Sequence, residues 1–150
     1  MENASARVVA TAALLFAAQA LAGDDDLPWA FNGPRSEGYS IDLASIEPAP
    51  GTPLLTGTSV EFRITLNYSL SISENGSIIL VFQDEKNRSA KPDGTQVVQA
   101  VSAPSGSITL TDTVTVPKQA KELRLFVPLV PDGVSETTGE VTIRYPIKKK

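Results

Sequence analysis

The chain contains neither cysteine nor histidine among its 150 residues. Without cysteine it has no disulfide, no thiol nucleophile and no thiolate ligands for zinc or an iron–sulfur cluster. Without histidine it lacks the imidazole base of the usual Ser or Cys hydrolase and the commonest transition-metal ligand. We therefore expect no cofactor, no metal site and no catalytic centre, with Ser–Lys dyads and paired carboxylates as the remaining exceptions.

An excess of basic residues is also missing. The chain has 13 Lys and Arg against 17 Asp and Glu, so its net charge is −4. A nucleic-acid-binding protein usually presents a basic face, and this balance argues against that class of partner. Hydrophobic residues make up 41% of the chain, which is enough to bury the core of one domain of ordinary size.

The longest uncharged apolar run, at positions 8–18, has eleven residues. A membrane span needs about 20, so the rival interpretation of this run as a membrane anchor is disfavoured. Arg7 precedes the run, and Ala20-Leu21-Ala22 follows it with the small residues that signal peptidase requires. We predict a signal peptide over 1–22, cleaved before Gly23, with no membrane span in the mature chain. The protein is then secreted, to a bacterial periplasm or the exterior.

Period-two alternation dominates from Tyr39 onward, and no helical period is found. Four sets of alternate apolar residues predict half-buried strands: Val60 to Tyr68, Ile108 to Val116, Leu123 to Leu129 and Val141 to Ile147. Residues 78–82 (IILVF) are apolar on both faces and predict a central strand. With two weaker candidates, the pattern predicts an all-β fold: an immunoglobulin-like two-sheet antiparallel β-sandwich of about seven strands over 39–147, with a barrel as the alternative.

Two residues break this pattern. Pro128 has no N–H to donate, so its strand is expected to lie at a sheet edge or to contain a bulge there. Asp112 falls on the apolar side of its strand, which predicts a β-bulge that turns the carboxylate outward, with a functional acid as the alternative.

The order of these strands resembles a known group of domains. A long alternating strand (VEFRITLNY) is followed by an Asn-Gly turn, an apolar strand (SIILVFQDE) and a closing pair (ELRLFVPLV, EVTIRYPI). This order is similar to bacterial secreted immunoglobulin-like modules of the fibronectin type III and CARDB-like groups. The resemblance covers about residues 39–147 and implies adhesion, spacing or ligand-docking roles.

Candidate binding residues lie in two segments outside the predicted strands. The segment 23–38, predicted as a flexible lead, contains Trp29 and Phe31, which are suited to anchor a partner or to add a strand to its sheet. The alternative is that both residues fold back and cap the sandwich. The loop after the central strand contributes four charged candidates: Lys86, Arg88, Lys91 and Asp93. Residues 148–150 form a basic tail.

The sequence thus favours an exported, non-catalytic module that binds a protein through loops or a strand edge, with a glycan as the less favoured ligand. A structural subunit that assembles through strand edges is the alternative, with residues 24–38 as the donated segment. A hydrolase with an unusual centre is the third hypothesis.

Overall fold

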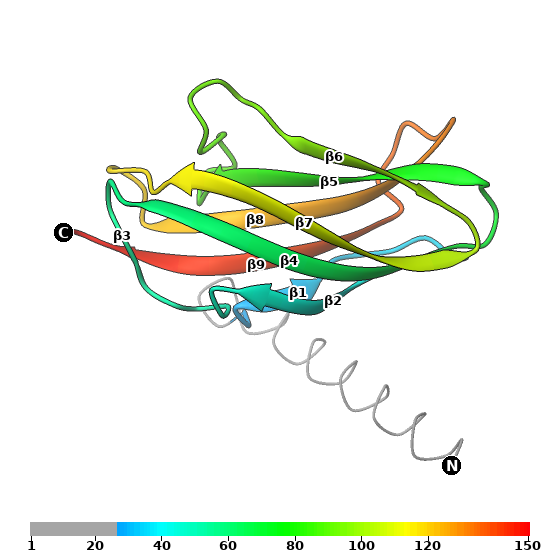
Figure 1. The fold of residues 1–150 in the computed structure, drawn as a ribbon, viewed down its shortest axis with the longest axis horizontal. Coiled ribbons are helices and arrows are strands. Elements are labelled where there is room, and N and C mark those ends of the chain that lie inside the picture. The colour runs from blue at the N-terminus through cyan, green and yellow to red at the C-terminus, as the bar shows by residue number, and fades with distance from the viewer. Residues whose placement is uncertain (1–26) are drawn as a thin grey trace, which may run out of the picture.

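The computed structural model describes residues 27–150, so the predicted signal peptide and the acidic run 24–26 lie outside the described residues. The described chain folds into two antiparallel sheets that pack face to face (Figure 1). The larger sheet has the order β1-β9-β8-β5-β6, and β3 pairs with β9 in parallel. Its strands are β1 (Ala30–Asn32), β3 (Leu54–Leu55), β5 (Asn75–Asp84), β6 (Val97–Ser102), β8 (Glu122–Pro131) and β9 (Gly139–Lys148).

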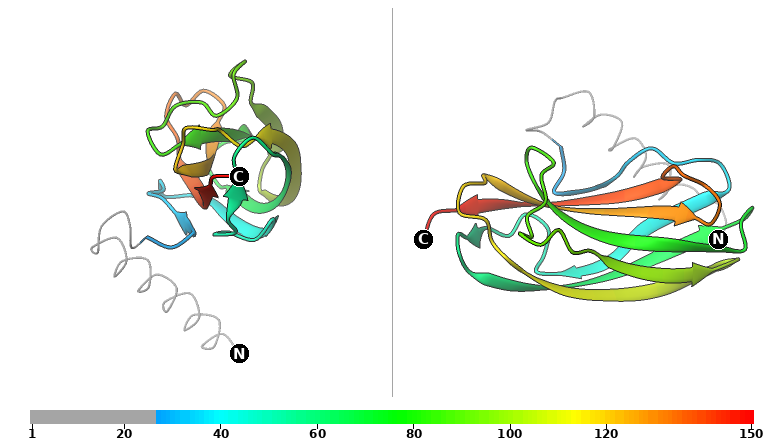
Figure 2. Two further views of the ribbon diagram at one scale, coloured as in Figure 1. Left: turned by 90° about the vertical axis from the view of Figure 1, so that its left-hand side faces the viewer. Right: turned by 90° about the horizontal axis from the view of Figure 1, so that it is seen from above.

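The smaller sheet has the order β2-β4-β7, formed by β2 (Tyr39–Glu47), β4 (Ser59–Leu70) and β7 (Ser105–Thr115). Seen end-on, the strands of the two sheets enclose a single interior (Figure 2). The two-sheet sandwich predicted from the alternation is therefore confirmed. Within the described residues, no helix has the length and apolar character needed to cross a membrane.

The core forms where the inward residues of both sheets meet. The alternate apolar residues of β4, β8 and β9 are buried as predicted, except for the partly buried Val60 and Ile147, and Phe62, Ile64, Leu125 and Ile143 have no exposed surface. The Phe62 ring lies between the large sheet's Phe82 and Tyr145, with ring centroids 5.4 and 5.2 Å away. These contacts join the two sheets at the centre of the sandwich, where burial of apolar side chains stabilises the fold most.

The described chain has nine strands where the pattern predicted about seven, and the two additional strands are short. One of them, β1, lies within the predicted flexible lead and pairs with β9 at positions 30–32. The other, β3, has only two residues and follows the Pro50-Gly51 turn. Neither segment is long enough to show an alternating pattern, which explains why the sequence did not indicate them.

Pro128 lies in β8, a central strand flanked by β5 and β9, and not at a sheet edge. It is paired with Glu140 on the β9 side. On the β5 side, pairing stops at Leu129 and resumes at Phe126, so the ladder is interrupted opposite the proline. A central strand thus accommodates the missing N–H by a local loss of pairing on one side.

Asp112 also differs from its prediction. The register of β7 with β4 is continuous from Ser59 to Ser69, so there is no bulge, and Asp112 lies directly opposite the buried Phe62. The carboxylate is tolerated on this inward side because the Lys91 ammonium reaches it at 2.6 Å. The loop after β5 therefore supplies the compensating charge that the strand sequence alone does not reveal.

Candidate interaction surfaces

Trp29 lies against the edge of the larger sheet, just before β1. Its carbonyl accepts a hydrogen bond from the Arg144 N–H at 2.6 Å, and its ring lies 5.2 Å from the Arg144 guanidinium. The ring also covers Gly51, where any Cβ would come within 2.6 Å of the indole. Trp29 nevertheless keeps 43% of its surface exposed. It is therefore a docked aromatic with one open face.

Phe31 lies in β1 opposite Thr142 of β9 and is half-buried. It lines a shallow groove of about 230 Å³ between the edges of the two sheets, together with Asp42, Leu43 and Val141. Asn32 closes the groove with a hydrogen bond from its side-chain amide to Asp42. The segment between Trp29 and Asn32 is thus used within the domain, as an edge strand of its own sheet.

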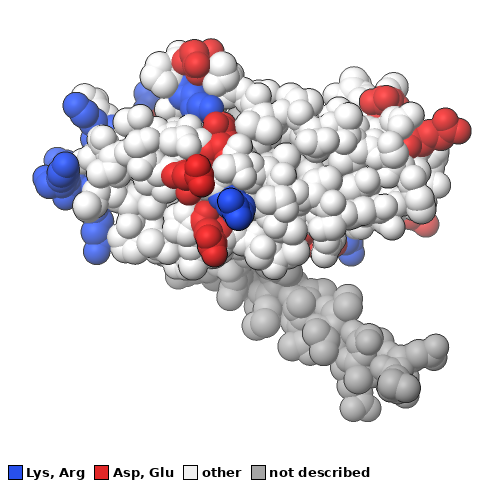
Figure 3. Space-filling view, in the orientation of Figure 1, with Lys and Arg blue, Asp and Glu red and all other residues white. Residues whose placement is uncertain are grey.

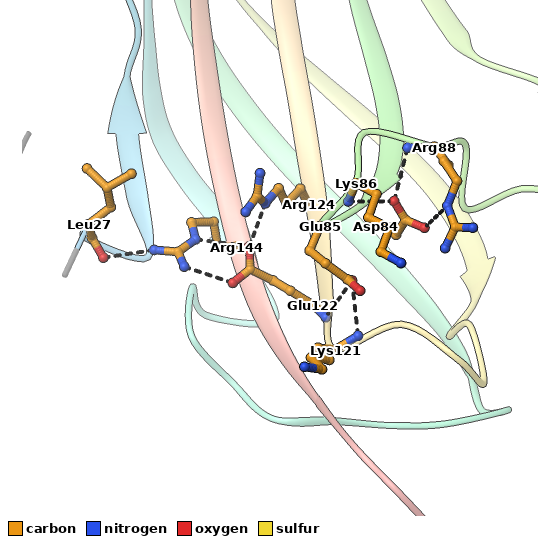
Figure 4. A network of polar contacts seen from close by, with 9 residues as sticks. All are labelled: Leu27, Asp84, Glu85, Lys86, Arg88, Lys121, Glu122, Arg124 and Arg144. Carbon is orange, nitrogen blue, oxygen red and sulfur yellow. Dashed lines mark hydrogen bonds and ion pairs between the residues drawn. The ribbon is translucent and has the colours of Figure 1, made fainter. Parts of the chain in front are cut away.

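A row of charged side chains crosses the larger sheet from β1 to the loop after β5 (Figure 4). Its centre is Glu122 at the start of β8. Arg144 forms a two-pronged ion pair with this carboxylate, with Nη2 at 2.8 Å from Oε2 and Nε at 3.0 Å from Oε1. Arg124 reaches the same carboxylate at 2.6 Å. The remaining Arg144 nitrogen, Nη1, donates to the Leu27 carbonyl at 2.9 Å, which holds the N-terminal segment on the sheet.

The electrostatics of this row follow from burial and pairing. Burial alone would raise the pKa of Glu122, but the hydrogen bonds and charges of Arg144 and Arg124 outweigh it and hold the pKa below its ordinary value. Glu122 is therefore ionised at neutral pH. A carboxylate that is ionised and bonded to two guanidiniums is unsuited to act as a general acid or base near neutral pH.

Asp84 organises the beginning of the loop after β5. Its buried carboxylate accepts hydrogen bonds from the Lys86 and Arg88 backbone N–H groups at 2.8 and 3.0 Å, and from the Arg88 Nε at 2.7 Å. Burial raises the pKa of Asp84, but these bonds outweigh burial and lower it overall. The side chains of Lys86 and Arg88 point outward from this rigid turn and are exposed.

The other two candidates of this loop, Lys91 and Asp93, form contacts with other residues of the domain. Lys91 pairs with Asp112, as described above, and lies 5.8 Å from the centre of the Phe82 ring. Asp93 is exposed, but its carboxylate accepts hydrogen bonds from the Thr95 backbone and hydroxyl. These bonds lower the pKa of Asp93. Lys91 and Asp93 thus shape the loop, and Lys86 and Arg88 are the members of the set that face solvent.

A cleft of about 560 Å³ lies at the same end of the sandwich, between the turn after β7 and the end of β9. It is lined by Thr56, Lys118, Gln119, Ala120, Lys121, Ile147 and Lys149. Its lining contains no acidic residue, and within residues 27–150 none of these lysines is in an ion pair. The backbone N–H of Lys121 binds the Glu85 carboxylate at 3.0 Å and so joins the cleft to the loop that carries Lys86.

The structure thus brings Lys86, Arg88, Lys118, Lys121 and residues 148–150 to one end of the molecule, which we call the basic end. Trp29 is linked to this end by contacts, because its ring lies against Arg144 and Arg144 pairs with Glu122. Phe31 lies further from this end, along the edge of the sheet. The sequence identified the tail and the loop separately but gave no indication that Lys118 and Lys121 join them. Arg144 was also missed, because an outward position in an alternating strand is normally solvated.

The opposite end of the sandwich is acidic (Figure 3). Its loops carry four exposed carboxylates against one guanidinium, that of Arg35: Glu37, Glu74, Asp132 and Glu136. The loops at this end are tied to one another by backbone bonds from Ser36 to Thr138 at 2.7 Å and from Asp132 to Asn75 at 2.9 Å. In the described part of the chain, no three acidic side chains gather closely enough to hold a metal ion.

Comparison of the sequence with protein families gives no match, and neither does comparison with curated proteins. Solved structures similar to the fold include the CARDB domain of a Pyrococcus furiosus protein in complex with two metal ions, at 9% identity and a TM-score of 0.48, covering 77% of this chain and 94% of that one. A CARDB domain is thus among the similar structures, in agreement with the sequence resemblance.

The C-terminal domain of Wzt is similar at 10% identity and a TM-score of 0.48, with 82% of this chain and 80% of that chain covered. A glycosyl hydrolase family 2 member from Bacteroides cellulosilyticus is similar at 12% identity and a TM-score of 0.47, over 73% of this chain. This match spans 14% of the hydrolase chain. At these identities the likeness concerns the fold alone.

Proposed function

We propose that this chain is an exported, non-catalytic β-sandwich module that binds an acidic protein surface through its basic end. The observation that carries the proposal is the cleft formed around Lys118, Lys121 and Lys149 without an acidic residue in its lining. Ammonium groups without carboxylate partners attract anionic groups and accelerate their encounter. The lining of the cleft also includes Ile147 and Ala120, so a partner that combines carboxylates with an apolar side chain fits it best.

Two further observations support binding at this end. Asp84 and Glu85 hold the neighbouring loops in place, so the exposed Lys86 and Arg88 are presented by rigid backbone and little conformational entropy is lost on binding. Trp29, the aromatic residue that approaches this end, is occupied on one face by Arg144 and Gly51. A glycan site usually contains an open aromatic platform, and the described residues that line the cleft include no aromatic one, so a protein partner is favoured over a glycan there.

The experiment uses a short acidic peptide containing one leucine, with a heparin oligosaccharide of equal charge and a neutral oligosaccharide as comparisons. The peptide is expected to shift the amide NMR signals of the cleft, and the variant K118Q/K121Q/K149Q to weaken its binding about tenfold. The control R63Q removes an exposed charge from the outer face of β4 and leaves binding unchanged. Equal binding to the triple variant, or stronger binding of the heparin, would refute a protein ligand at this cleft.

Export is tested separately, by expressing the whole chain in a bacterial host. The mature protein is expected in the periplasm or medium with Gly23 as its first residue, which N-terminal sequencing identifies. An intact Met1 on a cytosolic product would contradict the export part of the proposal and leave the binding part standing.

A second candidate function, a structural subunit, is favoured by the free edge of β7. This strand has 11 residues, pairs only with β4 among the described strands and carries Ser or Thr at every outward position, so its one charge is Asp112 on the inward side. Assembly through this edge is expected to stop when Thr111 and Thr113 are both changed to Lys. The control N67K places its lysine on the central strand β4 and not on the edge strand. Sedimentation velocity compares the assembly of the two variants.

A further inference from the structure

The two ends of the sandwich carry opposite charge along its long axis (Figure 3). The loops 85–96 and 116–121 and the residues 148–150 carry eight Lys and Arg against Glu85 and Asp93. The acidic end reverses this ratio, with four carboxylates against Arg35. The whole chain has a net charge of only −4, so this separation comes from placement and not from composition.

Exposed apolar side chains accompany the charges at both ends. Ile72, in the turn before β5, is 74% exposed at the acidic end, and Val134 is 37% exposed in the neighbouring loop. Leu55, at 45%, is exposed at the basic end beside the cleft, where it pairs with Lys148. One exposed aliphatic residue is ordinary on a protein surface. Here both charged ends carry exposed aliphatic side chains, and the most exposed of them, Ile72, lies at the end opposite the lysine-lined cleft.

Both ends are also pre-organised. The acidic loops are joined to each other by backbone hydrogen bonds, and the Ser71 N–H donates to the Gly38 carbonyl at 2.8 Å beside Ile72. At the basic end, Glu85 joins the two lysine-bearing loops. Two surfaces that are already ordered lose little entropy on docking, so complementary charge and a small apolar contact contribute more of their energy to association.

We infer that the acidic end of one copy docks on the basic end of the next, with Ile72 in the lysine-lined cleft and Glu74 and Glu136 facing Lys118 and Lys121. The inference rests on the proposed function and names its partner as a second copy of this chain. The two surfaces differ, so each docked copy leaves one end of each kind open. Such a heterologous contact propagates into a linear array.

Charge reversal tests this inference, because it predicts opposite results for single variants and for their mixture. The basic-end variant K118E/K121E places two carboxylates in the cleft against one remaining lysine, and the acidic-end variant E74K/E136K replaces two of the four carboxylates of the acidic end by lysines. Each is expected to be monomeric by itself, and an equimolar mixture is expected to associate again. The control E47K/E61K reverses two exposed charges on the outer face of the small sheet and is expected to associate like the native chain.

Sedimentation velocity over a concentration series measures all four proteins and the mixture. The native chain is expected to form a ladder of oligomers whose dissociation constant rises about tenfold or more between low and high salt. A native chain that stays monomeric, a ladder that survives either reversal, or a mixture that stays monomeric would overturn the inference. If the chain is monomeric but the acidic peptide still binds the cleft, self-docking is refuted and the proposed function stands; if neither binds, both are refuted.

Discussion

Replacement of Arg144 by methionine gives the sharpest test of how the N-terminal segment is held. Methionine keeps much of the side-chain volume but removes the two-pronged pair with Glu122 and the bond to the Leu27 carbonyl. The Arg144 side chain is 7% exposed and that of Glu122 is 12% exposed, so the carboxylate left behind is poorly solvated. The loss of one partner of a buried pair is strongly destabilising because the other charge stays buried.

The expected loss for R144M is about 3 kcal/mol, at the lower end of the range for broken buried pairs because Arg124 still reaches Glu122. With a urea dependence of about 2 kcal/mol per molar, this loss lowers the unfolding midpoint by about 1.5 M. The double variant E122M/R144M removes both charges. It is expected to return to within about 1 kcal/mol of the native protein, because replacing a whole buried pair by apolar residues is often neutral.

Acid pH provides a second measurement on the same variants. The pKa of Glu122 is lowered in the folded protein, so its stabilisation is complete above the ordinary value of 4.5 and is lost as the pH falls through the lower folded value. The stability gap between the native protein and R144M should therefore be widest at neutral pH and narrow in acid. A loss below about 1 kcal/mol, a double variant as unstable as R144M, or a gap that is constant with pH would refute the reasoning.

Three other substitutions test further contacts. Because a Cβ at Gly51 would overlap the indole of Trp29, G51A is expected to displace it and to shift the fluorescence of this single tryptophan to longer wavelength; an unchanged spectrum would contradict the docked position. Removing Asp112 alone by D112L leaves the Lys91 ammonium without its partner and should destabilise the fold by about 2 kcal/mol, whereas K91M/D112L should recover most of this loss in urea titrations; equal losses in the two variants would contradict the pairing. F62A should cost about 4 kcal/mol, because its ring joins both sheets; a calorimetric loss below about 1 kcal/mol would place the core elsewhere.

The alternation of apolar residues was sufficient to predict the sandwich, because each long strand buries one face and leaves the other in water. The residues at 60–68, 123–129 and 141–147 needed no tertiary information to be assigned. Pro128 and Asp112 could not be assigned in the same way. Their tolerance depends on an interrupted ladder in one case and on Lys91, from another loop, in the other.

The candidate site was predictable only in part, for a similar reason. Lys86 and Arg88 were identified because a long charged loop between strands favours recognition. Lys118 and Lys121 were not, because their proximity to residues 148–150 arises from the antiparallel pairing of β8 with β9. The roles of Trp29 and Arg144 depend on each other. Neither residue indicates by itself that a three-residue strand would form at positions 30–32.

The pairing of β1 with β9 has a consequence for the order of folding. Leu27 and Arg144, which bond across this edge, are 117 positions apart. The larger sheet therefore cannot close until nearly the whole chain has left the ribosome. A β-protein dominated by such distant pairings folds within milliseconds to seconds, and its early strands wait with their edges open. During that interval the unpaired edges of the early strands are open to pairing with neighbouring chains.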